Sequence, residues 1–410
     1  MRSRRATADP RYASVVQDRR IASPSLDRAL AQLAKRARVL PALHPRNAAA
    51  ERARLTAELE AGRVPVPRWD PLEKRDVRGL LGELDAVRIA LPEALPEPIA
   101  SLYRARLDEL ELDVALLDAL GDPRRVRPIA ARRYGKGNEA IEGRPLAEHA
   151  RAILERVASS DDPPSVPARA LATMMERAAR AVGLTLTVRL DARLSAGAAA
   201  GNHTIYVQDR PFGPIEARRL VAHEVLGHAI AGARGARETL AIFEVGTAGS
   251  FADQEGLAIT LEDAAGALDG ARWRILAARV VATDRMHGGA SFGETARALV
   301  RDVGLSAKVA ITTTERAYRG GGVARDAGYL AGLLRVRAAL DRGHATVDEL
   351  RAGRLDVSAV ATLRWAIHEG LARPLPPPID LLGVLGEAGC PPAPTRPDDQ
   401  SPGAGPRGGT

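Results

Sequence analysis

The sequence contains few cysteine, aromatic and lysine residues. Cys390 is the single cysteine, so the chain cannot form an internal disulfide bond, and a reducing compartment is expected. Aromatic residues make up 3% of the chain, whereas hydrophobic residues of all kinds make up 45%. The core must therefore be built mainly from alanine, leucine and valine, a composition that favours closely packed helices.

The sequence also lacks long apolar runs and recognisable targeting or nucleic-acid-binding signals. No stretch approaches the ~18 uninterrupted apolar residues of a membrane-spanning helix. The start, M-R-S-R-R-A-T-A-D-P-R-Y, is charged and has no apolar segment typical of a signal peptide. The net charge is +8, and part of it lies in the N-terminal segment and in 123–136. Neither stretch carries an interleaved aromatic ladder or a known nucleic-acid motif, which indicates a solvated basic surface, with attraction to acidic partners as the alternative. We therefore predict a cytoplasmic protein with no membrane or nucleic-acid partner.

Composition divides the 410-residue chain into parts. Residues 1–22 are polar, basic and aperiodic, and we expect them to be disordered. A helical subdomain is predicted over 23–158, where leucines recur every three or four residues. The stretch S-S-D-D-P-P-S-V-P at 159–167 is typical of a linker. A second domain is predicted over 167–385, followed by a disordered Pro/Gly-rich tail at 389–410.

The periodicity predicts a predominantly helical α+β fold with one small antiparallel sheet. Helices are expected over 26–40, 47–61, 72–89, 97–120, 145–158, 167–182, 215–233, 254–267, 270–282, 292–302 and 329–341. Alternating apolar and polar residues predict short strands near 184–190, 194–199 and 203–208, with Gly201-Asn202 as a hairpin turn.

One short segment carries a metal-binding pattern. V-A-H-E-V-L-G-H-A-I, residues 221–230, resembles the H-E-x-x-H zinc signature, but its second histidine lies at i+5. In an ideal α-helix, residues five apart point about 140° away from each other, so His223 and His228 could not share a metal. A π-bulge absorbs one residue and would align them, and Gly227 is where such an irregularity costs least. The alternative is that both histidines are ordinary helix residues.

A catalytic zinc ion needs a third protein ligand and an open position. Glu255, in Q-E-G-L-A, lies 27 residues after His228 at the start of the next predicted helix. A glutamate there can reach back to the first helix. Spacing alone also permits Glu238, Glu244 or Asp253, so the residue pattern leaves this choice open.

Together, H-E-V-L-G-H and D-Q-E-G-L-A resemble the flavohemoglobin expression-modulating QEGLA-motif family, which is related to the microtubule-associated tyrosine carboxypeptidases. The similarity covers roughly residues 25 to 385. It includes Tyr134-Gly135, R-A-Y-R-G-G-G (316–322) and R-D-A-G-Y-L-A-G (325–332). The resemblance implies a gluzincin-like catalytic domain over 167–385, with zinc bound by His223, His228 and Glu255 and with Glu224 as catalytic base.

This resemblance implies a zinc carboxypeptidase that acts on a peptide or protein C-terminus. Zinc would activate a water molecule, and Glu224 would accept its proton and deliver it to the leaving amine. The terminal carboxylate needs a bidentate partner, for which Arg316, Arg319 and Arg325 are candidates. The alternative is that these arginines belong to a solvated loop. The sequence has no recognisable microtubule-binding module, so we do not extend the resemblance to tubulin as a substrate.

The sequence also permits an oxyanion-stabilising tyrosine and a strand that binds the substrate. Tyr329 or Tyr318 could stabilise the oxyanion of the reaction, or either could be a packing residue. The strand at 203–208 could pair with an extended peptide substrate.

Two other functions fit the same motif. H-E-x-x-G-H also resembles the signature of dipeptidyl peptidase III, which would imply cleavage at the N-terminus, although Q-E-G-L-A argues against it. Alternatively, the protein is a regulatory binding protein with a structural or vestigial metal site. Zinc analysis would separate a metal enzyme from a protein without metal, and a peptide digest would show which terminus is cut.

Overall fold

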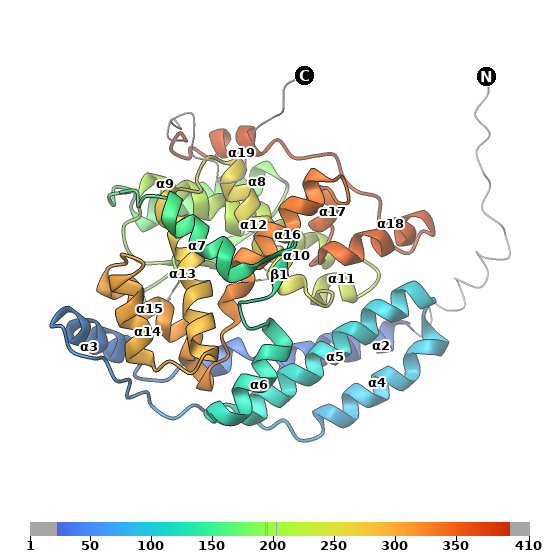
Figure 1. Ribbon diagram of the computed structural model, residues 1–410. Coiled ribbons are helices and arrows are strands. Elements are labelled where there is room, and N and C mark those ends of the chain that lie inside the picture. The colour runs from blue at the N-terminus through green and yellow to red at the C-terminus, as the bar shows by residue number, and fades with distance from the viewer. Residues whose placement is uncertain (1–22, 193, 195, 202, 394–410) are drawn as a thin grey trace.

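The computed structural model describes residues 23–393 except 193, 195 and 202. The predicted disordered segment 1–22 and most of the predicted tail 389–410 therefore lie outside the described residues. Helices form most of the described chain, and two small sheets complete it, so the predominantly helical α+β prediction is confirmed (Figure 1). No described helix is both long enough and apolar enough to cross a membrane.

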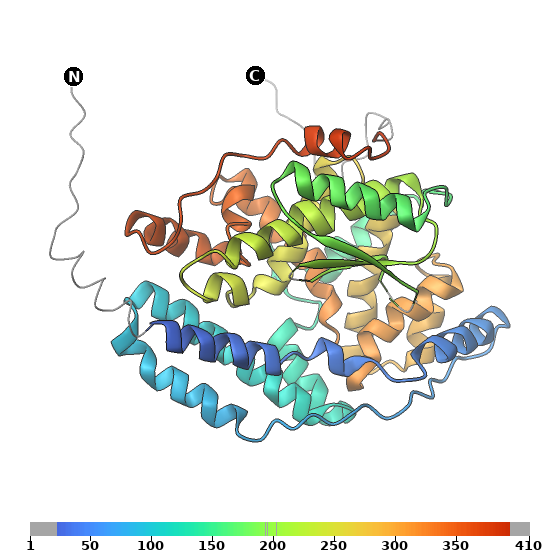
Figure 2. The same cartoon turned by 180° about the vertical axis from the view of Figure 1, so that it is seen from behind.

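The N-terminal helices lie along one side of the molecule (Figures 1 and 2). They are α2 (Ser23–Arg36), the 3-10 turn η1 (Leu40–Leu43), α3 (Ala48–Glu60), α4 (Leu80–Ala94), α5 (Glu97–Ala119) and α6 (Pro123–Tyr134). The next helix, α7 (Leu146–Arg156), instead packs against α13 (Gly270–His287). The sequence did not predict α6. Asp122 caps it by accepting a hydrogen bond from the Arg124 N–H at 3.0 Å, and Pro123 occupies its first position, so this Asp-Pro pair marks a helix start.

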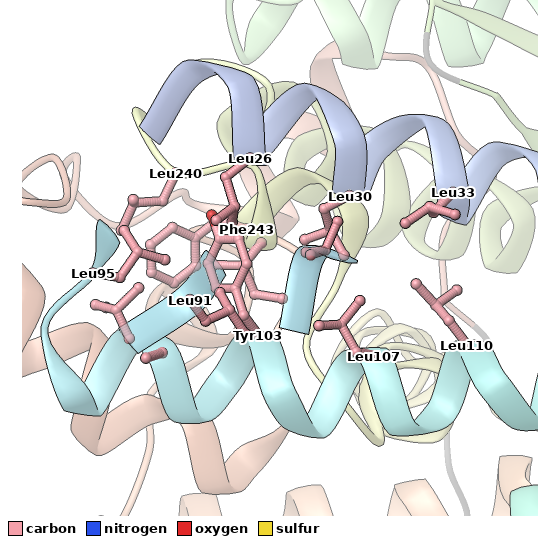
Figure 3. Close-up of a cluster of buried hydrophobic side chains, with 14 of the residues drawn as sticks. Leu26, Leu30, Leu33, Leu91, Leu95, Tyr103, Leu107, Leu110, Leu240 and Phe243 are labelled. Carbon is pink, nitrogen blue, oxygen red and sulfur yellow. The ribbon is translucent and has the colours of Figure 1, made fainter. Parts of the chain in front are cut away.

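The core of the N-terminal helices includes residues from later in the chain (Figure 3). Tyr103 and Leu107 of α5 face Leu30 of α2, and Phe243 of α11 (Ile242–Val245) packs into the same cluster. Each of these four side chains is completely buried. Burial of a side chain of this size contributes about 1.5–3 kcal/mol, so this shared core holds the N-terminal helices against the rest of the molecule.

A three-stranded sheet lies beside the central helices. Its strands are β3 (Thr187–Asp191), β4 (Ala198–Ala200) and β5 (Thr204–Gln208), in the order β3-β5-β4. β4 and β5 form the expected antiparallel pair around Gly201, but β3 pairs with β5 in parallel. The prediction of a wholly antiparallel sheet is therefore wrong, because β5 inserts between the two earlier strands. A two-residue pair, β1 (Ala140–Ile141) and β2 (Arg144–Pro145), forms the other sheet.

Most of the remaining chain is helical. Its elements are α8 (Ala168–Ala181), α9 (Pro214–Leu220), the π-helix η2 (Val221–Ala229), α10 (Ile230–Gly235), α12 (Ser250–Ala264), α13 (Gly270–His287), α14 (Phe292–Arg301), α15 (Ala307–Tyr318), η3 (Arg319–Gly321), η4 (Arg325–Ala327), α16 (Gly328–Asp341), α17 (Val347–Leu350), η5 (Val357–Ala359), α18 (Val360–His368) and α19 (Leu381–Glu387). η2 packs between α8 and α12, and α12 packs along α16. Near the end of the described chain, the Pro391 carbonyl accepts a 2.9 Å hydrogen bond from Arg218 of α9, which attaches this segment to the helical body.

Candidate metal centre

The segment with both histidines is a π-helix, continuous with α9 before it and α10 after it. A π-helix bonds each residue to the one five positions on, so residues five apart lie on the same face. His223 and His228 accordingly meet, with ring centroids 4.7 Å apart and Nε2 atoms 3.1 Å apart. The predicted distortion of this segment is confirmed, although it extends over nine residues instead of a single turn.

Gly227 allows η2 to approach its neighbour. Its φ lies outside the positive range, so the backbone conformation alone does not demand glycine. A Cβ atom at this position would lie 3.1 Å from the Cβ and 3.3 Å from the Cα of Ala258 on α12. The sequence pattern predicts that Gly227 permits a local backbone distortion, whereas in the structure the role of this glycine is to allow close packing of η2 against α12.

Glu255 of α12 completes a three-residue cluster with the two histidines. Its Oε2 atom lies 3.4 Å from His223 Nε2 and 3.7 Å from His228 Nε2. Ligand atoms about 2.0–2.1 Å from a tetrahedral zinc ion lie about 3.3 Å from one another, close to these separations. Glu255 Oε2 is buried and has no hydrogen-bond partner among the described residues, as expected for an oxygen that faces a cation. The two imidazoles and this carboxylate therefore fit a zinc ion.

Asp253 and Glu238, which spacing also permitted as the third ligand, bond to other groups. Asp253 accepts hydrogen bonds from Arg335 at 2.6 Å and from the Val357 N–H at 2.9 Å. Glu238 accepts a bond from the Arg373 N–H at 3.0 Å. Within the described part of the chain, His223, His228 and Glu255 form the one group of three potential ligands that converge.

Charge in the cluster favours a bound cation. Although burial alone would raise the pKa of Glu255, the imidazoles of His223 and His228 hold it well below its ordinary value. Burial alone would lower the pKa of His223, but the adjacent Glu255 carboxylate and the hydrogen-bonded Glu262 raise it to about 10. A proton is thus held where the carboxylates surround the imidazole, and a metal ion can replace it.

The Q-E-G-L-A segment combines a ligand with packing residues. Gln254 donates two 2.8 Å hydrogen bonds, one to the Leu350 carbonyl and one to the Leu355 carbonyl, which fixes the α12 backbone. A Cβ atom on Gly256 would lie 2.2 Å from the carbonyl carbon of Gly332 on α16. Glycine is required there because the two helix backbones are in contact. Residues on both sides of Glu255 therefore hold it in place.

Glu224, the predicted base, is buried beside the three-residue cluster. Its Oε2 accepts a 2.8 Å hydrogen bond from the N–H of Ala200 in β4. β4 is an edge strand, whereas β5 is paired on both sides. The prediction that 203–208 pairs with a peptide is therefore wrong, because β5 has no open edge in the described sheet; β4 is the edge strand that contacts Glu224.

The three predicted carboxylate-binding arginines separate into two groups. Arg316 donates from Nε to Asp326, and Arg319 lies 4.0 Å from the same carboxylate. Arg325 instead stacks on the ring of Phe251, with its guanidinium carbon 3.8 Å from the ring centroid. Its Nε is buried, and no residue in the described part of the chain accepts a hydrogen bond from it.

Tyr329 lies beside the metal centre, and Tyr318 does not contribute its hydroxyl to it. The Arg279 guanidinium, which the sequence analysis missed, lies 4.4 Å from the Tyr329 ring centroid. Burial and the nearby Glu255 carboxylate raise the pKa of Tyr329, so its hydroxyl remains protonated. The Tyr318 hydroxyl donates to the Ala290 carbonyl at 2.6 Å and is also bonded to Thr295 at 2.7 Å.

A cavity of about 320 Å³ opens onto the metal centre. His228 and Glu255 lie in its wall, together with Tyr134 of the Tyr134-Gly135 element and Phe251. Five arginines also line it: Arg38, Arg106, Arg133, Arg325 and Arg354. Its carboxylates are those of Asp113 and Glu255, so positive charge exceeds negative charge in this cavity.

Sequence reasoning also missed Glu262, whose Oε1 lies 2.7 Å from His223 Nδ1. Glu262 follows Glu255 by seven residues, or about two helical turns, so both carboxylates point to the same side of α12. That spacing is the sequence signal that could have identified it.

Comparison with known families gives one match. A family model described as microtubule-associated tyrosine carboxypeptidase matches residues 60–380. No curated protein and no solved structure matches the chain significantly.

Proposed function

The chain belongs to the microtubule-associated tyrosine carboxypeptidase family, and from this premise we propose that it is a zinc-dependent carboxypeptidase. The convergence of His223 Nε2, His228 Nε2 and Glu255 Oε2 is the observation that carries the proposal. We also propose that the chain is related to the QEGLA-motif proteins and has a gluzincin-like catalytic domain, because it contains H-E-V-L-G-H and Q-E-G-L-A.

His223, His228 and Glu255 would hold the metal, leaving a position for water. When bound, zinc lowers the pKa of its water to about 7 and polarises a carbonyl group. Glu224 follows His223 directly, and the Ala200 N–H orients its carboxylate through one oxygen. The carboxylate would accept the proton of the attacking water and transfer it to the leaving amine.

The substrate would lie along β4. In the described sheet no strand pairs with the outer edge of β4, so the groups of this edge other than the Ala200 N–H, which Glu224 occupies, could bond to an extended peptide backbone and bring it past Glu224. Tyr329 has a protonated hydroxyl near Glu255 and would donate a hydrogen bond to the oxyanion.

Positive charge in the cavity favours the C-terminus over the N-terminus as the bound end. Arg325 lies in the same cavity wall as His228 and Glu255, and its side chain is paired with an aromatic ring instead of a carboxylate. It is therefore our candidate for binding the terminal carboxylate in bidentate fashion. An enzyme that binds a free α-amino group would need an excess of acidic groups there.

A peptide digest tests this function. The purified protein is incubated with peptides that differ in their last residue, beginning with tyrosine because the family description names it. Mass spectrometry should show loss of one C-terminal residue, and C-terminal amidation should prevent it. Glu224→Gln should keep zinc and abolish cleavage. Shortening from the N-terminus, or full activity of Glu224→Gln, would contradict the proposal.

A further inference from the structure

Glu262 is the most buried carboxylate next to the metal centre. Only 1% of its surface is exposed, and its Oε1 lies 2.7 Å from His223 Nδ1. His223 therefore donates Nδ1–H to Glu262 and turns Nε2 towards His228 and Glu255. The function proposed above gives His223 the role of a ligand but gives Glu262 no role.

Arg272 of α13 holds Glu262 from the opposite side. Its Nη2 donates to Glu262 Oε1 at 2.9 Å and its Nε donates to Oε2 at 3.0 Å, a bidentate pair. Both oxygens of the Glu262 carboxylate are therefore held by Arg272, and Oε1 also accepts the hydrogen bond from His223 Nδ1–H.

The position of Arg272 is itself fixed by the chain before α13. Asp269 caps this helix by accepting the Arg272 N–H at 2.8 Å, and the Ser160 hydroxyl donates to Asp269 at 2.9 Å. Gly270 leaves room for this segment, since a Cβ there would lie 2.0 Å from the Ala158 carbonyl oxygen. A continuous series of hydrogen bonds leads from Ser160 to Glu262 and His223.

We propose that Glu262 is the positioning residue for the metal ligand His223, and that Arg272 holds Glu262 in this role. The inference rests on the proposed zinc site. The Nδ1–H bond would fix one tautomer and one ring orientation and would make Nε2 a stronger donor to the metal. A pair that serves only to stabilise the fold would leave zinc affinity unchanged once the protein has folded.

The test is the zinc affinity of Glu262→Gln, measured by competition with a chelator. We expect about 10–100-fold weaker binding than in wild type, the range typical of such partners. The visible spectrum of the cobalt-substituted protein should also change, because the orientation of His223 changes. Asp263→Asn is the matched control. It removes a charge from the next residue of α12, which pairs with Arg337 at 2.6 Å, and should leave zinc affinity unchanged.

A second variant covers the case in which Glu262→Gln does not fold with Arg272 left unpaired. Glu262→Leu combined with Arg272→Met removes both charges, and such replacements are often neutral for stability. It should also bind zinc about 10–100-fold more weakly. Wild-type zinc affinity in either folded variant would overturn the inference and leave the zinc site standing. Absence of zinc from the wild type would instead overturn the proposed function.

Discussion

Substitution of Gly256 by alanine should separate the two helices that support the metal centre. The added Cβ would lie 2.2 Å from the carbonyl carbon and 2.3 Å from the carbonyl oxygen of Gly332, and 2.5 Å from the Leu333 nitrogen. Carbon atoms in contact lie about 3.5–4.0 Å apart, so α12 and α16 would have to separate by at least about 1.3 Å. No rotamer change relieves this clash, since every contacting atom belongs to the backbone.

The magnitude follows from two opposing effects. Overpacking costs about 1–3 kcal/mol, and backbone atoms that cannot move aside place this case at the upper end. Alanine is favoured over glycine inside a helix by about 1 kcal/mol. The expected net loss of stability is about 2 kcal/mol, or a melting temperature about 2–3 °C lower for a chain of this length. Zinc affinity should fall about tenfold or more, because ligand distances tolerate changes of only about 0.2 Å.

Differential scanning calorimetry and chelator competition measure the two effects. Gly82→Ala is the matched control, since Gly82 lies in α4 with no atom within 4 Å of an added Cβ. It should be up to about 1 kcal/mol more stable than wild type and bind zinc equally well. If Gly256→Ala melted no lower than wild type and kept its zinc affinity, the assignment of Gly256 to backbone contact would be refuted.

Three other predictions follow from single contacts. Arg325→Lys should raise KM about tenfold or more with little change in kcat, because lysine loses the bidentate geometry and the stacking on Phe251; equal KM values in peptide kinetics would exclude Arg325 as the carboxylate ligand. Asp162→Ala should lower stability by about 1 kcal/mol, since Asp162 accepts the N–H groups of Ile215 at 3.1 Å and Glu216 at 2.7 Å at the start of α9; denaturant unfolding with the exposed neighbour Asp161→Ala as control would show whether this cap matters. Burial raises the pKa of the Cys390 thiol to about 11, so alkylation at pH 8 should be on the order of a hundredfold slower than for an ordinary thiol, because little thiolate is present. A fast reaction at pH 8 would contradict the burial of this thiol.

The sequence predicted the elements with clear periodicity and missed those without it. Helix 97–120 agrees with α5 because its leucines recur at helical spacing. α15 was missed because its run of Thr312, Thr313 and Thr314 favours strands. Thr312 and Thr314 instead bond to the carbonyls four residues earlier, at 2.9 and 2.8 Å. Strand pairing was only partly predictable, since the parallel contact of β3 with β5 depends on chain path and not on local pattern.

The sequence identified the candidate residues of the site, whereas the residues that hold them in position are seen only in the structure. The extra residue between His223 and His228 predicted the irregular helix, because a metal site requires both imidazoles on one face. Partners such as Arg272 and Arg279 could not be predicted, because in an arginine-rich chain nothing local distinguishes a buried arginine from a solvated one. Nor could the sequence predict that Arg316 bonds to Asp326 while Arg325 stacks on Phe251, because both contacts depend on the tertiary structure.

The zinc content of protein purified without added metal tests the central claim most directly. Inductively coupled plasma mass spectrometry should find one zinc ion per chain in the wild type and none in His228→Ala or Glu255→Ala. His368→Ala, which removes an exposed histidine of α18, should retain the metal. A wild-type protein without zinc, or zinc that persists after both ligand substitutions, would contradict the account.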